Sequence, residues 1–119
     1  GWGNGKATAV LLARQGATIY GTDISLAAAE ETRALIAAEG GTAHAAAVDM
    51  TKAQEVEAAV ADCLARFGRI DILVNNVGGS APGDPVAMSE EVWDAQLDLN
   101  LKTAFLACKH VIPVMERQG

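Results

Sequence analysis

The chain has 119 residues, half of them hydrophobic, which is enough for one small domain with a buried core. Its formal net charge of −6 leaves no basic patch for a phosphate backbone, which argues against nucleic acid or an anionic membrane surface as a partner. No uncharged apolar stretch reaches the roughly 18 residues of a spanning helix, and neither cysteine has a metal-ligating neighbour, so we expect no metal and, by default, a cytoplasmic location.

The chain opens with three glycines in five residues, Gly1, Gly3 and Gly5, and residues 6–15 then have the pattern of a helix that Gly16 ends. Glycine lets the backbone approach a ligand closely, and the first turn of a helix offers free N–H groups and a positive dipole end. A pyrophosphate fits this arrangement, although an ordinary turn is the alternative for a glycine run alone. Residue 1 already lies inside this glycine loop, so we expect the binding unit to begin upstream of it.

A β-prone run, residues 18–22, follows and ends at Asp23, eighteen positions after Gly5. This spacing is close to the roughly 20 residues that separate a dinucleotide-binding loop from its ribose-binding acid. A carboxylate there can accept hydrogen bonds from both ribose hydroxyls, and it repels the additional phosphate of NADP. Because the next residue, Ile24, brings no positive charge, the sequence favours NAD over NADP. The alternative for Asp23 is a turn or capping carboxylate before the next helix.

The middle of the chain continues to alternate between helical and strand-like patterns. Ser25 can cap a helix over residues 26–39, which Gly40 ends. An alanine-rich strand is predicted over residues 42–48, and Asp49 closes it.

Another helix and another strand are predicted next. Thr51 and Gln54 have the spacing of a capping box, and the helix that they begin ends at Gly68. Residues 70–74 are almost continuously apolar, as in a strand covered on both faces of a parallel sheet. A loop rich in glycine, proline and serine separates this strand from two helical stretches over residues 89–115.

The second of these stretches is expected to carry an apolar face made of Leu101, Phe105, Cys108 and Ile112. Pro113 is expected to limit or bend the helix near its end. Both cysteines of the chain occupy positions where a helical pattern favours small apolar residues, so we expect reduced core thiols.

Strands that alternate with helices of this length indicate βαβ units, so the predicted fold is α/β, a three-layer doubly wound parallel sheet. Ligands of such sheets bind outside the carboxyl ends of the strands. We expect the glycine loop, Asp23, Asp49 and the loop of residues 75–79 to converge there. Asp23 and Asp49 as metal ligands or an acid–base pair form a weaker alternative, because no histidine or third acid accompanies them.

Taken in order, these motifs resemble the N-terminal half of a short-chain dehydrogenase/reductase, over essentially the whole chain. Gly3 and Gly5 match the last two glycines of the family's Thr-Gly-x-x-x-Gly-x-Gly loop, with Asn4 in place of the usual isoleucine. Residues 75–78, Asn-Asn-Val-Gly, match the family's Asn-Asn-Ala-Gly signature. By this alignment Trp2 lies in the loop beside the cofactor.

The resemblance implies roles for residues further along the chain. The Asp49-Met50 pair resembles the pair that touches the adenine ring, and Asn76 and Gly78 are placed near the ribose and adenine. Asn100 matches the helix asparagine with which the family holds a water in its proton relay. We therefore expect the cofactor to be bound by Gly3, Asn4, Gly5, Asp23, Ile24, Asp49, Met50, Asn76 and Gly78. For Asn75 we favour a structural role, in which its side-chain amide locks the loop to a neighbouring element.

The family passes a hydride between a nicotinamide cofactor and a carbonyl or secondary alcohol, so the resemblance implies an NAD(P)-dependent oxidoreductase with a small-molecule substrate. It also implies a homo-oligomer that pairs through the long helix at the end of this chain. The catalytic serine, tyrosine and lysine of the family would follow residue 119, so we expect this chain alone to be inactive. Without the family's first strand, we also expect it to be unfolded or aggregating.

Two other classes of function remain open at this point. A non-catalytic dinucleotide sensor would keep the cofactor loop and lack the tyrosine and lysine. A methyltransferase that uses S-adenosylmethionine also has a glycine loop and an acid after the second strand. We favour it less, because its chemistry does not require the Asn-Asn-Val-Gly run.

Overall fold

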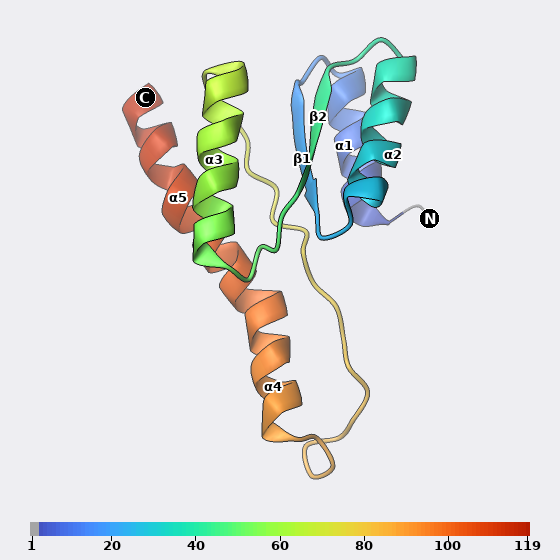
Figure 1. The fold of residues 1–119 in the computed structure, drawn as a ribbon, viewed down its shortest axis with the longest axis vertical. Helices are drawn as coiled ribbons and strands as arrows, with labels where there is room; N and C mark the ends of the chain where they lie inside the picture. The colour runs from blue at the N-terminus through green and yellow to red at the C-terminus, as the bar shows by residue number, and fades with distance from the viewer. Residues whose placement is uncertain (1–2) are drawn as a thin grey trace. The chain divides into compact units, whose positions relative to one another are not determined.

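The computed structural model describes residues 3–119, and the chain forms two compact units, Gly1–Asp49 and Met50–Gly119 (Figure 1). Gly1 and Trp2 lie outside the described residues, and so does the expected place of Trp2 beside the cofactor. Each unit has helices and buried side chains of its own, and each is described below by itself.

The first unit consists of α1 (Asn4–Arg14), β1 (Ile19–Asp23), α2 (Leu26–Ala38) and β2 (Ala43–Ala47). The two strands pair in parallel, with each residue of β1 opposite the residue 24 positions later in β2. Parallel strands need a crossover connection, and α2 provides it. The predicted βαβ unit is therefore confirmed in this part of the chain.

Two ion pairs align the helices of the first unit. Lys6 Nζ lies 2.5 Å from Glu31 Oε1 near the start of α1, and Arg14 Nη2 lies 2.7 Å from Glu39 Oε1 near its end. Both pairs join residues 25 positions apart, so α1 and α2 run side by side in the same direction. Ion pairs at the surface contribute little to stability, but these two show how α1 and α2 are aligned.

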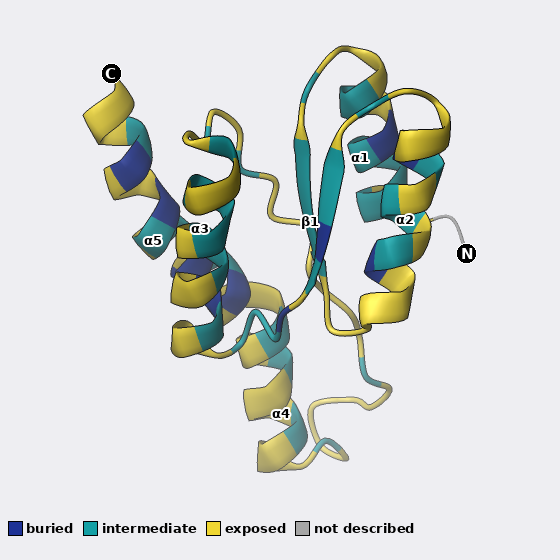
Figure 2. Cartoon of the chain, turned by 45° about the horizontal axis from the view of Figure 1, so that its top comes forward, coloured by how far each residue is buried: buried dark blue, intermediate teal, exposed yellow. Residues whose placement is uncertain are grey.

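The core of the first unit lies between the helices and the strand pair. Val10 of α1 is 2% exposed and Ile36 of α2 is 1% exposed. Figure 2 marks buried positions in dark blue on the helices of this unit. In β2 the buried residue is Ala45, and Val48 just beyond the strand is also buried. Alanine is a poor strand former, yet its small side chain lets α2 pack close to the strand. Packing outweighs strand propensity here.

The second unit is helical: α3 (Ala53–Phe67), α4 (Glu90–Leu97), the π-helix η1 (Asp98–Lys102) and α5 (Thr103–Gln118). α3 packs against α5, and α4, η1 and α5 follow one another without a break. Its buried side chains come from α3 and α5: Val56, Thr103, Leu106, Ala107, Val111 and Val114.

The helix ends test the predicted caps. The Ser25 side chain accepts a hydrogen bond from the N–H group of Ala28, so the predicted N-cap is confirmed, and the Ser89 side chain caps α4 in the same way, by accepting from the N–H group of Val92. Gly68 ends α3 with a φ of 78°, a left-handed conformation that favours glycine.

The prediction of a capping box is wrong. The box at Thr51 does not form, because α3 begins one residue later, after Lys52, with no side-chain cap. Pro113 does not end its helix, which continues to Gln118, while the bend that was the other expectation stays a prediction. The proline side chain is exposed, so its ring meets solvent rather than a packed neighbour.

Residues 70–74 are not a strand, which corrects the prediction for this segment. A strand is defined by a ladder of hydrogen bonds to a neighbour, and the sheet that the described residues contain has only β1 and β2. The segment instead runs as an irregular connection, with Ile72 61% exposed and Val74 49% exposed. Its apolar side chains are of the kind that is usually buried, but residues 3–119 do not bury them.

Gly41 offers a test of the packing in the first unit. A Cβ at this position would lie 2.7 Å from Ile36 Cγ2 and 3.2 Å from the Ile36 carbonyl oxygen. Since Ile36 is fully buried, we expect Gly41→Ala to lower the free energy of unfolding of the full-length protein by about 1–3 kcal/mol. The control is Gly21→Ala, whose Cβ would meet only the His44 carbonyl oxygen, at 3.8 Å. Equal urea midpoints for the two variants would show that Gly41 is not tightly packed against Ile36.

We expect the 119-residue chain, expressed alone, to show no cooperative thermal unfolding. A two-stranded sheet is marginal in water, and large side chains such as Ile72, Leu101 and Phe105 remain more than half exposed in this part of the protein. Circular dichroism during heating measures this directly. A single sharp transition would show that the chain is an independent folding unit after all.

Candidate functional site

The first turn of α1 is open to a ligand. Gly3 is the N-cap, in extended conformation, and its carbonyl accepts the Ala7 N–H at 3.1 Å. Within the described chain, no side chain caps the N–H groups of this turn, and the turn contains no acidic residue. A Cβ at Gly3 would meet no described atom within 4 Å, so packing among the described residues does not require glycine. Free amides beside open space suit a phosphate group.

The neighbouring residues of this turn share its exposure. Asn4 is the first residue of α1 and is exposed, while Gly5 is half-buried. The helix thus begins before the predicted residue 6. Within the described residues, the Asn4 side chain makes no hydrogen bond, which leaves its amide available to a ligand.

Asp23 is the exposed last residue of β1. Its Oδ1 accepts the Ser25 N–H at 2.8 Å, so the carboxylate does shape the turn into α2, as the alternative interpretation expected. Among residues 3–119, its other oxygen, Oδ2, accepts no hydrogen bond and stays available to a hydroxyl donor. The next side chain, Ile24, is 77% exposed.

These groups lie at one end of the first unit. α1 and α2 run in the same direction, and α2 follows β1 after a turn of two residues, so α1 begins where β1 ends (Figure 1). β2 is parallel to β1 and ends there as well, and the half-buried Asp49 comes two residues after it. The structure therefore brings together the glycine turn, Asp23 and Asp49 at the carboxyl ends of the strands.

In the second unit, Asn100 holds the loop that follows the Asn-Asn-Val-Gly run. Its Oδ1 accepts the Gly79 N–H at 2.9 Å, and its Nδ2 donates to the Gly79 carbonyl at 2.9 Å. The same Nδ2 also donates to the Gln96 carbonyl at 2.9 Å. A Cβ at Gly78 would lie only 3.0 Å from Asn100 Oδ1, so this close approach favours glycine. The Asn100 side chain is thus a loop anchor.

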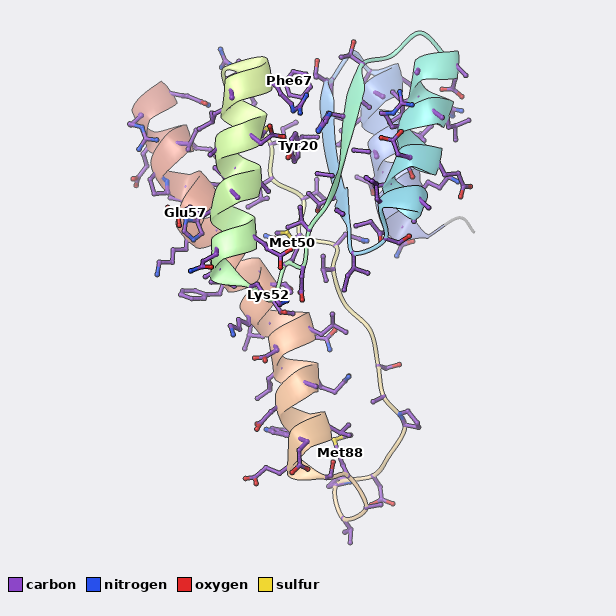
Figure 3. The ribbon with its side chains drawn as sticks, in the orientation of Figure 1. Tyr20, Met50, Lys52, Glu57, Phe67 and Met88 are labelled. Carbon is purple, nitrogen blue, oxygen red and sulfur yellow. The ribbon has the colours of Figure 1, made fainter. Side chains whose placement is uncertain are left out.

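Three other residues with expected roles also belong to this unit. The Asn75 side chain donates to Cys108 Sγ on α5, at 3.6 Å, in keeping with the expected structural role. Asn76 is exposed, and within residues 3–119 its side chain makes no hydrogen bond. Met50 is half-buried in the connection before α3 (Figure 3).

Two further side-chain environments are defined by the structure. The ring of His44 lies 5.3 Å from that of Tyr20, its cross-strand neighbour, which Figure 3 labels. Register alone could have revealed this pair. Both cysteines are free, but they are half-buried rather than core residues. Burial raises the pKa of the Cys63 thiol.

Among residues 3–119, no group of three His, Cys, Asp or Glu side chains could hold a metal ion. Within the same residues, every helix is too short or too polar to cross a membrane.

Comparisons with known proteins agree with this geometry. The family model described as short chain dehydrogenase matches residues 1–119. Among curated relatives, the 3-oxoacyl-acyl-carrier-protein reductase FabG of Thermotoga maritima is 38% identical over 98% of this chain, and the probable galactose dehydrogenase GalD of Rhizobium meliloti is 38% identical over 100%. The chain spans 47% of each relative, about half of its length.

Solved structures give the same result for the fold. A short-chain dehydrogenase/reductase from Burkholderia xenovorans is 53% identical, with a TM-score of 0.96 over 100% of this chain and 47% of that one. A 3-ketoacyl-ACP reductase from Sinorhizobium meliloti is 31% identical, with a TM-score of 0.91 over 99% of this chain and 47% of that one. The predicted fold class, an incomplete doubly wound sheet, is confirmed. The chain belongs to the short-chain dehydrogenase family.

Proposed function

We propose that this chain is the cofactor-binding part of an NAD-dependent oxidoreductase, which transfers a hydride between nicotinamide and a carbonyl or secondary alcohol of a small molecule. The observation that carries the proposal is the end of the first unit, where the uncapped first turn of α1 and the carboxylate of Asp23 lie together. Family membership supports the reaction class and removes the methyltransferase alternative. A cytoplasmic location stays a prediction.

The preference for NAD rests on Asp23 and its neighbour. Oδ2 can accept a hydrogen bond from a ribose hydroxyl, while Oδ1 keeps the turn in place. A phosphate on that ribose would face the carboxylate as a like charge, at about 4 kcal/mol for a separation near 4 Å and an effective dielectric near 20. Ile24 offers an apolar surface to the adenine and no positive charge to such a phosphate.

The pyrophosphate is assigned to the turn of Gly3, Asn4 and Gly5, whose free amides and open space suit an anion. Asp49 and Met50 are assigned to the adenine ring. From the second unit we assign Asn76, whose exposed amide has no partner among the described residues, and Gly78. The bound cofactor would supply the hydride, and these residues would bind and orient it.

For Asn100, we separate the expected role in proton relay between the main chain and the side chain. Both polar atoms of its side chain are engaged with Gly79 and Gln96. We therefore assign the binding of a relay water to the main chain of η1 at this residue. The side chain would act by holding the loop and the π-helix in register.

An exposed apolar face on η1 and α5 supports a homo-oligomer. Leu101 of η1 is 65% exposed, and Phe105 and Ile112 of α5 are 59% and 48% exposed; all three lie on the face that the sequence predicted to be apolar. A shallow groove on this face is lined by Phe105, Cys108, Lys109, Ile112 and Pro113. Self-association would remove this apolar surface from water.

The proposal is tested by titrating the full-length protein with NAD and NADP and by following NADH oxidation with a panel of ketones, aldehydes and 3-oxoacyl thioesters. We expect NAD to bind more tightly than NADP, and Asp23→Asn to weaken NAD binding about tenfold while improving NADP binding, because Asn keeps the Ser25 contact and loses the charge.

Asp94→Asn, an exposed site on α4, removes the same charge and is the control. An NAD-to-NADP preference that does not move with Asp23 would contradict the cofactor assignment. Tight binding of NAD without turnover of any substrate would favour the alternative function, a non-catalytic dinucleotide sensor.

The anchoring role of Asn100 gives a second prediction. Asn100→Ala removes all four contacts with Gly79 and Gln96, three of them at 2.9 Å, so we expect kcat/KM to fall about tenfold or more, as for the loss of hydrogen bonds worth about 1 kcal/mol each. Gln96→Ala loses only a 3.5 Å contact between side chains and should stay within about twofold. Steady-state kinetics with the best substrate of the panel measures both. Equal effects of the two variants would refute the anchor.

A further inference from the structure

Thr103 is the one polar residue among residues 3–119 that is buried, with 3% of its surface exposed. It lies where η1 passes into α5, inside the continuous helix that Figure 1 shows from α4 to the C-terminus. A buried hydroxyl group needs a hydrogen-bond partner, and Thr103 Oγ1 donates to the Leu99 carbonyl at 2.8 Å. What this contact does for the helix depends on where the main-chain N–H of Thr103 is bonded.

The N–H of Thr103 is bonded one carbonyl further back. In a regular α-helix an N–H donates to the carbonyl four residues before it, which here would be that of Leu99. The Thr103 N–H instead donates to the Asp98 carbonyl, five residues before it, in the pattern of a π-helix. The hydroxyl thus occupies the carbonyl that the N–H of the same residue would take in an α-helix, so Thr103 supports the wider turn with both of its donors.

Asn100 makes an equivalent contact earlier in the same turn. Its Nδ2 donates to the Gln96 carbonyl, again four residues back, at 2.9 Å. Two side chains three residues apart therefore supply hydrogen bonds to main-chain carbonyls within and just before η1. A π-helix is rare and is found frequently at functional sites, and these contacts stabilise the one that contains Asn100.

Leu99 connects Thr103 to the loop that Asn100 holds. A Cβ at Gly79 would lie 3.2 Å from Leu99 Cδ2, so the Leu99 side chain packs directly on the residue that pairs with the Asn100 amide. The Thr103 hydroxyl in turn holds the Leu99 main chain. All of these contacts are made by residues 79–103 of the second unit, and none of them involves a strand.

We propose that Thr103 is a positioning residue for the proton relay: its hydroxyl holds η1 in the π-helical pattern that directs the main chain of Asn100. The proposal rests on the proposed function, which assigns the relay water to that main chain. Thr103 itself touches neither substrate nor cofactor in this assignment, and it acts through Leu99 and Asn100. Loss of the hydroxyl should slow proton delivery and leave the binding of the cofactor nearly unchanged.

The test compares Thr103→Val, Thr103→Ser and Thr103→Ala with the wild type in the full-length protein. Threonine and valine differ by the hydroxyl and so do serine and alanine, so the effect of the hydroxyl is read twice. With NADH and the best substrate of the carbonyl panel, we expect kcat to be about three- to tenfold lower in the hydroxyl-free member of each pair. The Kd for NAD should stay within about twofold, as for a contact that leaves ground-state binding unchanged.

The readout that separates positioning from a general loss of structure is the solvent deuterium isotope effect on kcat. Reduction of a carbonyl consumes a proton, so slower delivery should make the hydroxyl-free variants more sensitive to D2O. Thr32→Val is the control, because Thr32 Oγ1 makes the same kind of contact, with the Ala28 carbonyl at 3.4 Å, inside the regular helix α2. This variant should change neither kcat nor the isotope effect.

Equal kcat values within both pairs would overturn the proposal, and so would a lower kcat with an unchanged isotope effect or a matching change in Thr32→Val. If Thr103→Val alone fails to fold, the serine and alanine variants decide. Failure of both hydroxyl-free variants to fold would also overturn it, because the hydroxyl would then support the fold as a whole. A wild type that binds NAD and turns over no substrate would instead refute the proposed function, and the relay with it.

Discussion

The pairing of main-chain N–H and C=O groups is the constraint on which the rest of this structure depends. In the first unit a parallel ladder between β1 and β2 satisfies it, and this ladder places the ends of both strands beside the start of α1. In the second unit the π-helix η1 departs from the α-helical pattern, and the side chains of Asn100 and Thr103 bond main-chain carbonyls there. One requirement thus has two solutions, and each of them positions residues of the proposed site.

Features encoded by neighbouring residues could be predicted from the sequence. Ser25 and Ser89 cap helices because a hydroxyl reaches an N–H three residues ahead, and Gly68 ends a helix because it tolerates a positive φ. The one cap that failed, at Thr51, failed by one residue, since Lys52 takes the N-cap position. Such local rules fix where elements begin and end, but not what lies beside them.

Contacts between distant residues could not be predicted in the same way. The apolar residues 70–74 have the composition of a strand, but a strand exists only where a partner supplies its ladder. Nothing in the sequence around Gln118 indicates that its side chain bonds the main chain of Ile70, 48 positions away, and the bidentate contact of Asn100 with Gly79 is equally invisible. The motifs indicated residues for the candidate site, whereas the contacts of these residues with distant parts of the chain depend on the fold.

The common direction of α1 and α2 has an electrostatic consequence for an otherwise acidic protein. Two helices that start at the same end both bring the partial positive charge of their first turns to the edge that also carries the carboxylates of Asp23 and Asp49. At α2 the carboxylate of Asp23 and the Ser25 cap offset that charge, whereas the first turn of α1 keeps it. Partial positive charge is therefore greater at α1 than at β1 along this edge. A ligand with an anionic group and a sugar would bind in one orientation, with its anionic group at α1 and its sugar hydroxyls at β1.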